Sequence, residues 1–279
     1  MPPRRLRLDA ELVRRGLARS REHAGELIAA GRVKVAGARA TKAATGVTTD
    51  VAIVVTRDPD RPDYVSRGGH KLAGALAVLA PLGLEVRGRR CLDAGASTGG
   101  FTDVLLRAGA AEVVAVDVGY GQLAWSLRSD ERVRVHDRTN IRDLTVETIG
   151  GPVDVVVGDL SFISLELVLD ALTGVTRDDG DLALMVKPQF EVGKDRVGKG
   201  GVVRDLDLRV EAVAGVAEAA AVRGWGAAAV SVSPLPGPSG NVEFFLLLRR
   251  GAPVIGEAEI RAEVERNASL GVAGERVEP

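Results

Sequence analysis

Four charged side chains stand where an α/β domain would bring charged groups together. Asp159 and Lys187 each end a short apolar run, Glu243 opens another, and Lys71 lies at the start of an expected helix. Open sheets bind ligands at the carboxyl ends of their strands. We therefore expect these four residues to face one crevice, whereas the plainer alternative is four surface charges at the ends of strands and helices.

Four charged residues of this kind can remove a proton from a substrate. Burial among apolar strands and the like charge of Lys71 disfavour the ammonium form of Lys187, while the two carboxylates oppose that shift. A lysine in this setting can serve as a general base, and Asp159 would orient it. Lys71 and Glu243 would hold the acceptor in line for a direct displacement. Such a set requires neither a protein nucleophile nor a metal ion.

A glycine-rich segment, residues 90–103, predicts a ligand for this crevice. It reads as a short buried strand, a turn and a helix start. Its glycines follow G-x-x-x-G-G rather than the G-x-G-x-x-G of dinucleotide sites, so no tight pyrophosphate turn is encoded. Asp93 ends the first strand and Asp117 ends the next, where a carboxylate can accept both ribose hydroxyls. This pattern favours the cationic nucleoside S-adenosylmethionine, and a plain strand, turn and helix is the alternative.

A methyl donor beside a general base predicts methylation of a weak nucleophile. A ribose 2′-hydroxyl is such an acceptor, and removing its proton as the methyl arrives is worth on the order of a hundred- to ten-thousand-fold. Lys187 is the predicted base, and Asp159 would also lie beside the transferred methyl. The residues predicted to contact S-adenosylmethionine, in the loop and at the strand ends, are Asp93, Gly95, Ser97, Gly99, Gly100, Phe101, Asp117 and Asp159.

Composition and cysteine count describe an ordinary globular chain. Its 279 residues are 46% hydrophobic, which suffices for one large domain and a small one. The single cysteine, Cys91, excludes an internal disulfide framework and favours a cytoplasmic location. No stretch reaches the roughly 18 to 20 apolar residues of a membrane span, and no export signal follows the N-terminal arginines. His23, His70 and His136 lie far apart without ligand spacing, so no metal site is predicted.

Charge is divided unevenly along the chain. Residues 1–62 hold 13 Lys and Arg against 7 Asp and Glu, a net charge of plus six, and the remainder holds 24 against 31, a net charge of minus seven. A basic end of this kind indicates a polyanionic partner. A solvated basic helix face is the alternative.

The basic end reads as a compact unit over residues 8–56. Asp9 and Ser20 are expected N-caps of two short helices, and Gly31 ends the second. Strands follow over 32–35 and 51–55, which gives the order helix, helix, small sheet.

The motifs of this unit are Leu8-Asp9-x-x-Leu12, Gly16-Leu17, Ser20-Arg21-x-x-Ala24, Leu27-Ile28-x-x-Gly31 and Val33-x-Val35. In these motifs the unit resembles the S-four-type RNA-binding fold. The resemblance implies that the second helix and the following turn face phosphates, so basic residues there would set RNA affinity by counterion release. The residues that we place on RNA, including one from the second domain, are Arg7, Arg19, Ser20, Arg21, Arg32, Lys34 and Arg67.

Strands and helices alternate from residue 64 onward. Strands are expected near 90–94, 112–117, 132–136, 153–158, 182–187, 227–233 and 242–248, with helices between them. The last two are joined by too short a connection for a crossover helix, so they should pair as an antiparallel hairpin at one edge of the sheet. We expect a Rossmann-like α/β fold with a seven-stranded mixed sheet, covered by helices on both faces and preceded by a small α+β domain.

The predicted organisation has four parts. They are an RNA-binding domain over 1–57, a linker over 58–64, the α/β domain over 65–251 and a polar C-terminal extension over 252–279. The linker assignment rests on two prolines and alternating charges, which oppose both helix and strand.

The order Lys71, Asp159, Lys187, Glu243 around this crevice matches the catalytic tetrad of the FtsJ-like ribose 2′-O-methyltransferases. Further motifs are V-S-R-G-G-H-K-L over 65–72, L-D-A-G-A-S-T-G-G-F-T over 92–102, D-V-G-Y-G-Q-L over 117–123, D-L-S-F-I-S over 159–164, V-K-P-Q-F-E over 186–191 and P-G-P-S-G-N-V-E over 236–243. With the basic unit in front, the chain closely resembles the TlyA (hemolysin A) family.

This resemblance implies cytidine 2′-O-methylation in ribosomal RNA, of the 16S or 23S kind or both, with ribosomal subunits as partners. It also implies an adenosine contact from Asp137. That residue stands where the family's E-R-T-N segment carries glutamate, and the shorter acid leaves the contact open.

Three other functions compete with this one. The segment D-L-S-F over 159–162 stands where base amino-methyltransferases carry an Asp/Asn-Pro-Pro-aromatic motif. It lacks the prolines of that motif, and the presence of Lys187 also argues against base methylation. A non-catalytic RNA-binding or ribosome-assembly protein would be expected to lose a tetrad residue, and none is absent. Membrane lysis needs an amphipathic or spanning segment, and the best candidate, 206–223, has the alanine- and valine-rich face of a sheet-packed helix. The oligomeric state stays open.

Overall fold

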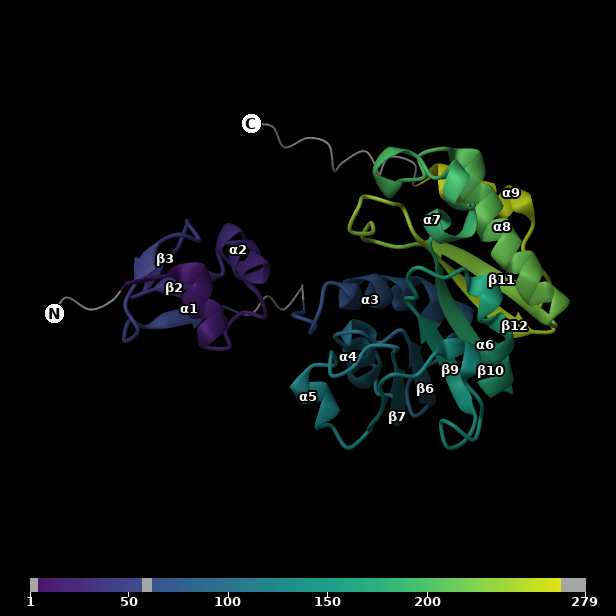
Figure 1. Ribbon diagram of the computed structural model, residues 1–279, viewed down its shortest axis with the longest axis horizontal. Helices are drawn as coiled ribbons and strands as arrows, with labels where there is room; N and C mark the ends of the chain where they lie inside the picture. The colour runs from purple at the N-terminus through teal and green to yellow at the C-terminus, as the bar shows by residue number, and fades with distance from the viewer. Residues whose placement is uncertain (1–4, 57–61, 267–279) are drawn as a thin grey trace. The chain divides into compact units, whose positions relative to one another are not determined.

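The computed structural model describes residues 5–56 and 62–266, and the chain divides into two compact units, Met1–Asp63 and Tyr64–Pro279 (Figure 1). Residues 58–61 of the predicted linker, residue 57 before them, and residues 267–279 of the predicted C-terminal extension lie outside the described residues. Within the described part of the chain, no helix combines the length and the apolar character that crossing a membrane requires.

The first unit has the predicted order of two helices and a small sheet. Its core is built from apolar residues of both helices and of the sheet, among them Leu8, Leu12, Leu27 and Val33. Strand β2 is central in a three-stranded antiparallel sheet of order β3-β2-β5, and β1 pairs with β4. The elements are β1 (Leu6–Arg7), α1 (Leu8–Arg14), α2 (Arg21–Ala29), β2 (Val33–Val35), β3 (Ala38–Arg39), β4 (Gly46–Val47) and β5 (Ile53–Val55).

One of the two predicted N-caps is confirmed and the other is wrong. The Ser20 hydroxyl oxygen accepts a hydrogen bond from the backbone N–H of His23 at the start of α2. Helix α1 begins at Leu8, two residues earlier than an N-cap at Asp9 predicts, so Asp9 lies inside its first turn. Asp9 is buried and forms ion pairs with Arg7 and Arg21, both at 2.9 Å. Charge pairing outcompetes capping here because two arginines flank the carboxylate.

The second unit is the predicted α/β domain. Its elements are α3 (Gly68–Leu79), β6 (Arg90–Ala94), α4 (Gly100–Arg107), β7 (Glu112–Val116), α5 (Trp125–Arg128), β8 (Val133–His136), β9 (Val153–Gly158), α6 (Leu169–Val175), β10 (Thr176–Val186), α7 (Pro188–Glu191), α8 (Leu206–Val222), β11 (Trp225–Val232), β12 (Phe244–Arg250) and α9 (Glu257–Arg266). The seven strands form one sheet of order β11-β12-β10-β9-β6-β7-β8. The seven-stranded mixed sheet is therefore confirmed.

The sheet is buried on both faces, as its near-continuous apolar strands predict. Successive residues of a strand point to opposite faces, so Cys91 and Leu92 of β6 belong to two separate hydrophobic clusters. The cluster containing Leu92 includes residues of α6 and α8, and the cluster containing Cys91 includes residues of α3 and α4. Helices thus cover the sheet on two sides (Figure 1).

The C-terminal hairpin is also confirmed. Strands β11 and β12 pair antiparallel at one edge, and β12 is antiparallel to β10 as well. The short connection after β11 therefore returns the chain into the sheet between its outermost strand and β10. The polar extension forms α9, whose Ile260 and Val264 are almost fully buried in the core shared with α8 and β11.

Acid should loosen the first unit. Hydrogen bonds from arginines lower the pKa of Asp9, chiefly through Arg7, and lower that of Glu11 to about 2, chiefly through Arg14. A lowered folded-state pKa stabilises the fold at neutral pH, and this contribution is lost as the pH falls below about 4 toward the folded-state values. The urea midpoint followed by NMR signals of residues 5–56 should fall between pH 7 and pH 3, and less so in Glu11→Gln. An unchanged midpoint would contradict this.

Candidate active site

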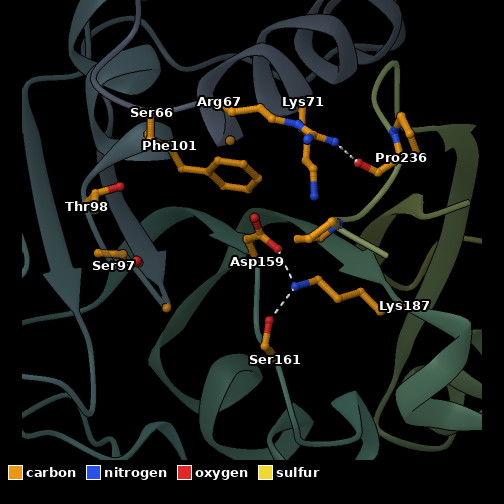
Figure 2. A pocket seen from close by; sticks show the side chains of 15 residues that line it. Ser66, Arg67, Lys71, Ser97, Thr98, Phe101, Asp159, Ser161, Lys187 and Pro236 are labelled. Carbon is orange, nitrogen blue, oxygen red and sulfur yellow. Dashed lines mark hydrogen bonds and ion pairs between the residues drawn. The ribbon is translucent and has the colours of Figure 1, made fainter. Parts of the chain in front are cut away.

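Two of the four predicted catalytic residues follow neighbouring parallel strands. Asp159 comes directly after β9 and Lys187 directly after β10, and these strands pair in parallel with Leu184 opposite Gly158. The shared register brings Lys187 Nζ to 2.6 Å from Asp159 Oδ1, in an ion pair without good hydrogen-bond alignment. Lys187 Nζ also donates a hydrogen bond of 2.7 Å to the hydroxyl of Ser161 (Figure 2).

The other two predicted catalytic residues form a second pair. Lys71 lies in the first turn of α3, and Glu243 directly precedes β12. Lys71 Nζ donates to Glu243 Oε2 at 2.5 Å, and the two side chains are 7% and 1% exposed. Burying a charge is costly unless an opposite charge compensates it, so each of these residues requires the other.

A cavity of about 280 Å³ lies between these pairs and the glycine-rich loop. Figure 2 shows Lys71 reaching into this space from one side and Asp159 and Lys187 from the other. Glu243 does not line the cavity, but it binds the amine of Lys71, which does. The lining residues are Ser66, Arg67, Gly68, Lys71, Gly95, Ala96, Ser97, Thr98, Gly100, Phe101, Asp159, Ser161, Lys187, Pro236 and Pro238.

The glycine-rich loop follows β6 as predicted, and Gly99 and Gly100 explain its shape. Gly99 has φ +97°, a left-handed conformation that favours glycine at the residue before α4. Gly100 is the point of closest approach to the start of α3. A Cβ atom on it would lie 2.2 Å from Ser66 Oγ and 2.8 Å from the backbone nitrogen of Gly69. The two helix starts beside the cavity therefore pack together without a side chain between them.

Asp93 lies beneath this loop and not in the cavity lining. Its side chain is fully buried, and Oδ2 accepts a hydrogen bond of 2.6 Å from the Thr102 hydroxyl. Burial raises the pKa of Asp93 to about 7. Its other oxygen, Oδ1, is buried without a hydrogen-bond partner among the described residues. A buried acceptor of this kind is costly, so it marks a place for a donor from a ligand or from water.

Asp117 follows β7 and ties two loops together. Its Oδ2 accepts from the Ser97 backbone N–H at 2.8 Å, and its Oδ1 accepts from the Gly119 N–H at 2.7 Å. An ionised carboxylate offers about four acceptor positions, so two hydrogen bonds leave room for a pair of hydroxyls.

Asp137 is held in place by neighbours of its own unit. Its Oδ2 accepts from Arg128 at 2.5 Å and from the Gly121 N–H at 3.2 Å, and the Arg128 bond is the largest cause of its lowered pKa.

Phe101 lies against Phe245 in a stacked pair with ring centroids 6.0 Å apart. The predicted contacts of Asp137 and Phe101 with a ligand stay predictions.

The residues predicted to bind RNA differ in how strongly internal contacts engage them. Lys34 and Arg19 are exposed, whereas Arg32 forms an ion pair of 2.6 Å with Asp63. Arg7 and Arg21 form ion pairs with Asp9, and their side chains remain 51% and 59% exposed. Ser20 caps α2 of the first unit. In the second unit, Arg67 donates a hydrogen bond of 2.6 Å to the Pro236 carbonyl across the cavity mouth (Figure 2). RNA binding by these residues stays a prediction.

Sequence reasoning missed several lining residues. Ser161 bonds Lys187, and Ser66 and Pro236 border the cavity, yet none was predicted as a site residue. All three lie in the motifs D-L-S-F, V-S-R-G-G and P-G-P-S-G, so their closeness in sequence to Asp159, Lys71 and Glu243 was the available signal.

Comparisons with known proteins agree with this architecture. Residues 64–250 match the FtsJ-like methyltransferase family, and residues 6–53 match the S4 domain. The fold and the site therefore define a methyltransferase preceded by an S4 domain. The chain belongs to the TlyA family of FtsJ-like methyltransferases and is an enzyme.

Its relatives carry two kinds of name. The chain is 62% identical to the 16S/23S rRNA (cytidine-2′-O)-methyltransferase TlyA of Mycobacterium tuberculosis, covering 88% of this chain and 90% of that one. It is 35% identical to Hemolysin A of Brachyspira hyodysenteriae, covering 86% of this chain and 98% of that one. A solved structure from Streptococcus thermophilus, named for a hemolysin, superposes with a TM-score of 0.75 at 35% identity, covering 98% and 99% of the two chains.

Substituting Gly100→Ala should weaken binding of the nucleoside ligand. The new methyl group would meet backbone at the start of α3 at 2.8 Å, so the two helix starts and the loop must shift. Calorimetry with S-adenosylmethionine should report at least a tenfold loss of affinity, of the size expected when positioned groups move by about 1 Å. Gly215→Ala in α8, where a Cβ meets nothing within 4 Å, is the matched control and should bind normally. Equal affinities for both variants would contradict the packing argument.

Proposed function

We propose that this protein transfers the methyl group of S-adenosylmethionine to the 2′-hydroxyl of a cytidine ribose in ribosomal RNA. The observation that carries the proposal is the Lys187–Asp159 ion pair, at the carboxyl ends of adjacent strands and beside a cavity that the glycine-rich loop also lines. The name of the 62% identical relative supports the substrate class. The S4 match supports RNA as the partner.

The residues present fit S-adenosylmethionine. Asp117 has acceptor positions left for two ribose hydroxyls, and the partnerless Oδ1 of Asp93 lies under the loop where an amino group or a bridging water could donate. The methionine portion would lie along Gly95 and Ser97 toward Asp159. When bound, the sulfonium supplies an electrophilic methyl group.

Lys187 is the base in this proposal. An amine nitrogen has room for three partners besides its own carbon. The Ser161 hydroxyl takes one position by a hydrogen bond, and the Asp159 carboxylate, 2.6 Å away, occupies a second side of the nitrogen. The third is left for a substrate hydroxyl in the cavity. Lys187 accepts the hydroxyl proton while the oxygen forms its bond to the methyl carbon, and the electron pair of the breaking carbon–sulfur bond stays on sulfur. Asp159 stabilises the resulting ammonium by its opposite charge.

Lys71 positions the acceptor. Glu243 balances the charge of Lys71, and a second, weak hydrogen bond joins Lys71 Nζ to Met185 Sδ. The third donor of the ammonium can hold a ribose oxygen in the cavity. Holding the hydroxyl in line with the carbon–sulfur bond is the main contribution that a protein can make to a direct displacement.

The rival activities fit this site less well. Base amino-methylation would not need the Lys187–Asp159 pair, and the loop after Asp159 carries Leu160-Ser161 where the prolines of that motif would stand. A purely RNA-binding role would leave two lysine–carboxylate pairs at a cavity, one of them buried, without a purpose. Buried ion pairs contribute little to stability, so their presence at the cavity favours catalysis.

Lys187→Ala should abolish ribose methylation while S-adenosylmethionine affinity stays unchanged. The loss should reach at least about a hundredfold, because the proton acceptor is removed from the transition state. Lys187→Arg should be nearly as inactive, since a guanidinium keeps its proton. The measurement is transfer of tritiated methyl groups to purified ribosomal subunits. Substantial turnover by the arginine variant would show that positive charge alone is required, and the general-base role would be withdrawn.

Lys34→Ala should weaken RNA binding and leave methyl-donor binding intact. Removing one phosphate contact should lower the slope of log affinity against log salt by about one. Arg250→Ala is the matched control. Arg250 is the last residue of β12, at the other end of the strand from Glu243, and it pairs with Asp178. Equal salt slopes for wild type and Lys34→Ala would contradict a phosphate contact at this residue.

A further inference from the structure

The loop after Asp159 follows a strained path. Phe162 has φ +64° and is 91% exposed. A left-handed backbone is uncommon for a bulky residue, and an exposed phenyl ring gains nothing from core packing. Such a conformation persists where the surrounding contacts fix it, and it is concentrated at functional sites.

One short segment fixes this loop at both ends. Lys187 donates to the hydroxyl of Ser161, before Phe162, and Glu191 binds the loop after it. Glu191 Oε2 accepts from the Ser164 hydroxyl at 2.6 Å, and Oε1 accepts from the Leu165 N–H at 3.0 Å. Lys187 and Glu191 belong to one five-residue segment, which consists of the residue directly after β10 and the four residues of α7.

A ring contact joins the same two segments between these hydrogen bonds. The rings of Phe162 and Phe190 lie 5.3 Å apart at an interplanar angle of 48°. Glu191 itself is only partly exposed, and burial raises its pKa against the effect of its hydrogen bonds. A partly buried carboxylate with both oxygens committed to one loop is well suited to hold that loop in place.

We propose that Glu191 is a positioning residue for methyl transfer. It does not line the cavity, so it acts through the loop that it binds. By fixing Ser164 and Leu165, Glu191 keeps Ser161 on the Lys187 amine and keeps Lys187 directed at the acceptor. The inference rests on the proposed function, because it assigns Glu191 to the reaction in which Lys187 is the base.

The test compares Glu191→Ala and Glu191→Gln with a matched control, Glu166→Ala. Glu166 is an exposed carboxylate two residues after Ser164. Turnover is divided by the number of S-adenosylmethionine sites counted by calorimetry, so unfolded molecules do not contribute. Glu191→Ala should lower kcat per site by about tenfold or more, as expected for a misplaced catalytic group, with methyl-donor affinity within about twofold of wild type.

Glu191→Gln should recover most of the lost activity, to within about threefold of wild type. Its amide oxygen can accept from Leu165, and its amide N–H can donate to Ser164. Ser164→Ala should lower kcat in the wild type but add little in the Glu191→Ala background, because both changes remove the Ser164–Glu191 hydrogen bond. The Ser164 hydroxyl also accepts from the Glu166 backbone N–H at 3.2 Å, so only the effect of losing that bond should remain in the double variant. The serine variant leaves Glu191 in place, so it tests the same contact if Glu191→Ala does not fold.

Each outcome bears on one claim. Wild-type kcat per site in Glu191→Ala, a glutamine variant as poor as the alanine variant, or an equal loss in Glu166→Ala would overturn the positioning role while the proposed function stands. A wild-type enzyme that methylates no ribose would refute the proposed function and this inference with it.

Discussion

The contact between Lys187 and Asp159 is the constraint on which the site depends. Two opposite charges meet at 2.6 Å only because β9 and β10 are adjacent, parallel and in a register that ends them together. Charges at that edge are costly to bury, so the sheet's apolar strands must stop there and the following residues must pair or meet a ligand. The glycine-rich loop after β6, the next strand in the sheet, then supplies the backbone against which a nucleoside can lie.

The reversed strand β12 completes the site from the other direction. Since β12 is antiparallel to β10, its first residues lie at the edge where the parallel strands end. Glu243 therefore lies at this edge of the sheet because it precedes a strand, whereas Asp159 and Lys187 lie there because each follows a strand. Lys71 lies on α3, and its Nζ forms an ion pair of 2.5 Å with Glu243 Oε2. Lys71 and Glu243 form one balanced pair, and in the proposed reaction Asp159 balances the ammonium that Lys187 becomes when it accepts the hydroxyl proton. Proton transfer to Lys187 therefore leaves no uncompensated positive charge in the site.

Sequence periodicity predicted most of the fold, because buried parallel strands and helices leave clear apolar patterns. It also placed Asp159 and Lys187 together, since strand ends on one sheet edge converge. It failed at Asp9, which pairs with two arginines and does not cap α1. The ligand contact of Asp93 stays a prediction, and the sequence did not indicate that this side chain is fully buried. The hydrogen bonds that Glu191 accepts from Ser164 and Leu165 depend on how α7 lies against the loop after Asp159. Neither hydrophobic periodicity nor motif spacing predicts that arrangement.

In the proposed function, exposed basic residues of the first unit supply RNA affinity and the cavity of the second unit supplies the chemistry. The most direct test of this account is mass mapping of methylated nucleosides in ribosomal RNA from cells with and without the protein. The account predicts that 2′-O-methylcytidine is lost at defined positions when the protein is absent and returns with the wild type but not with Lys187→Ala. Loss of a methyl group from a base, or unchanged ribose methylation, would contradict it.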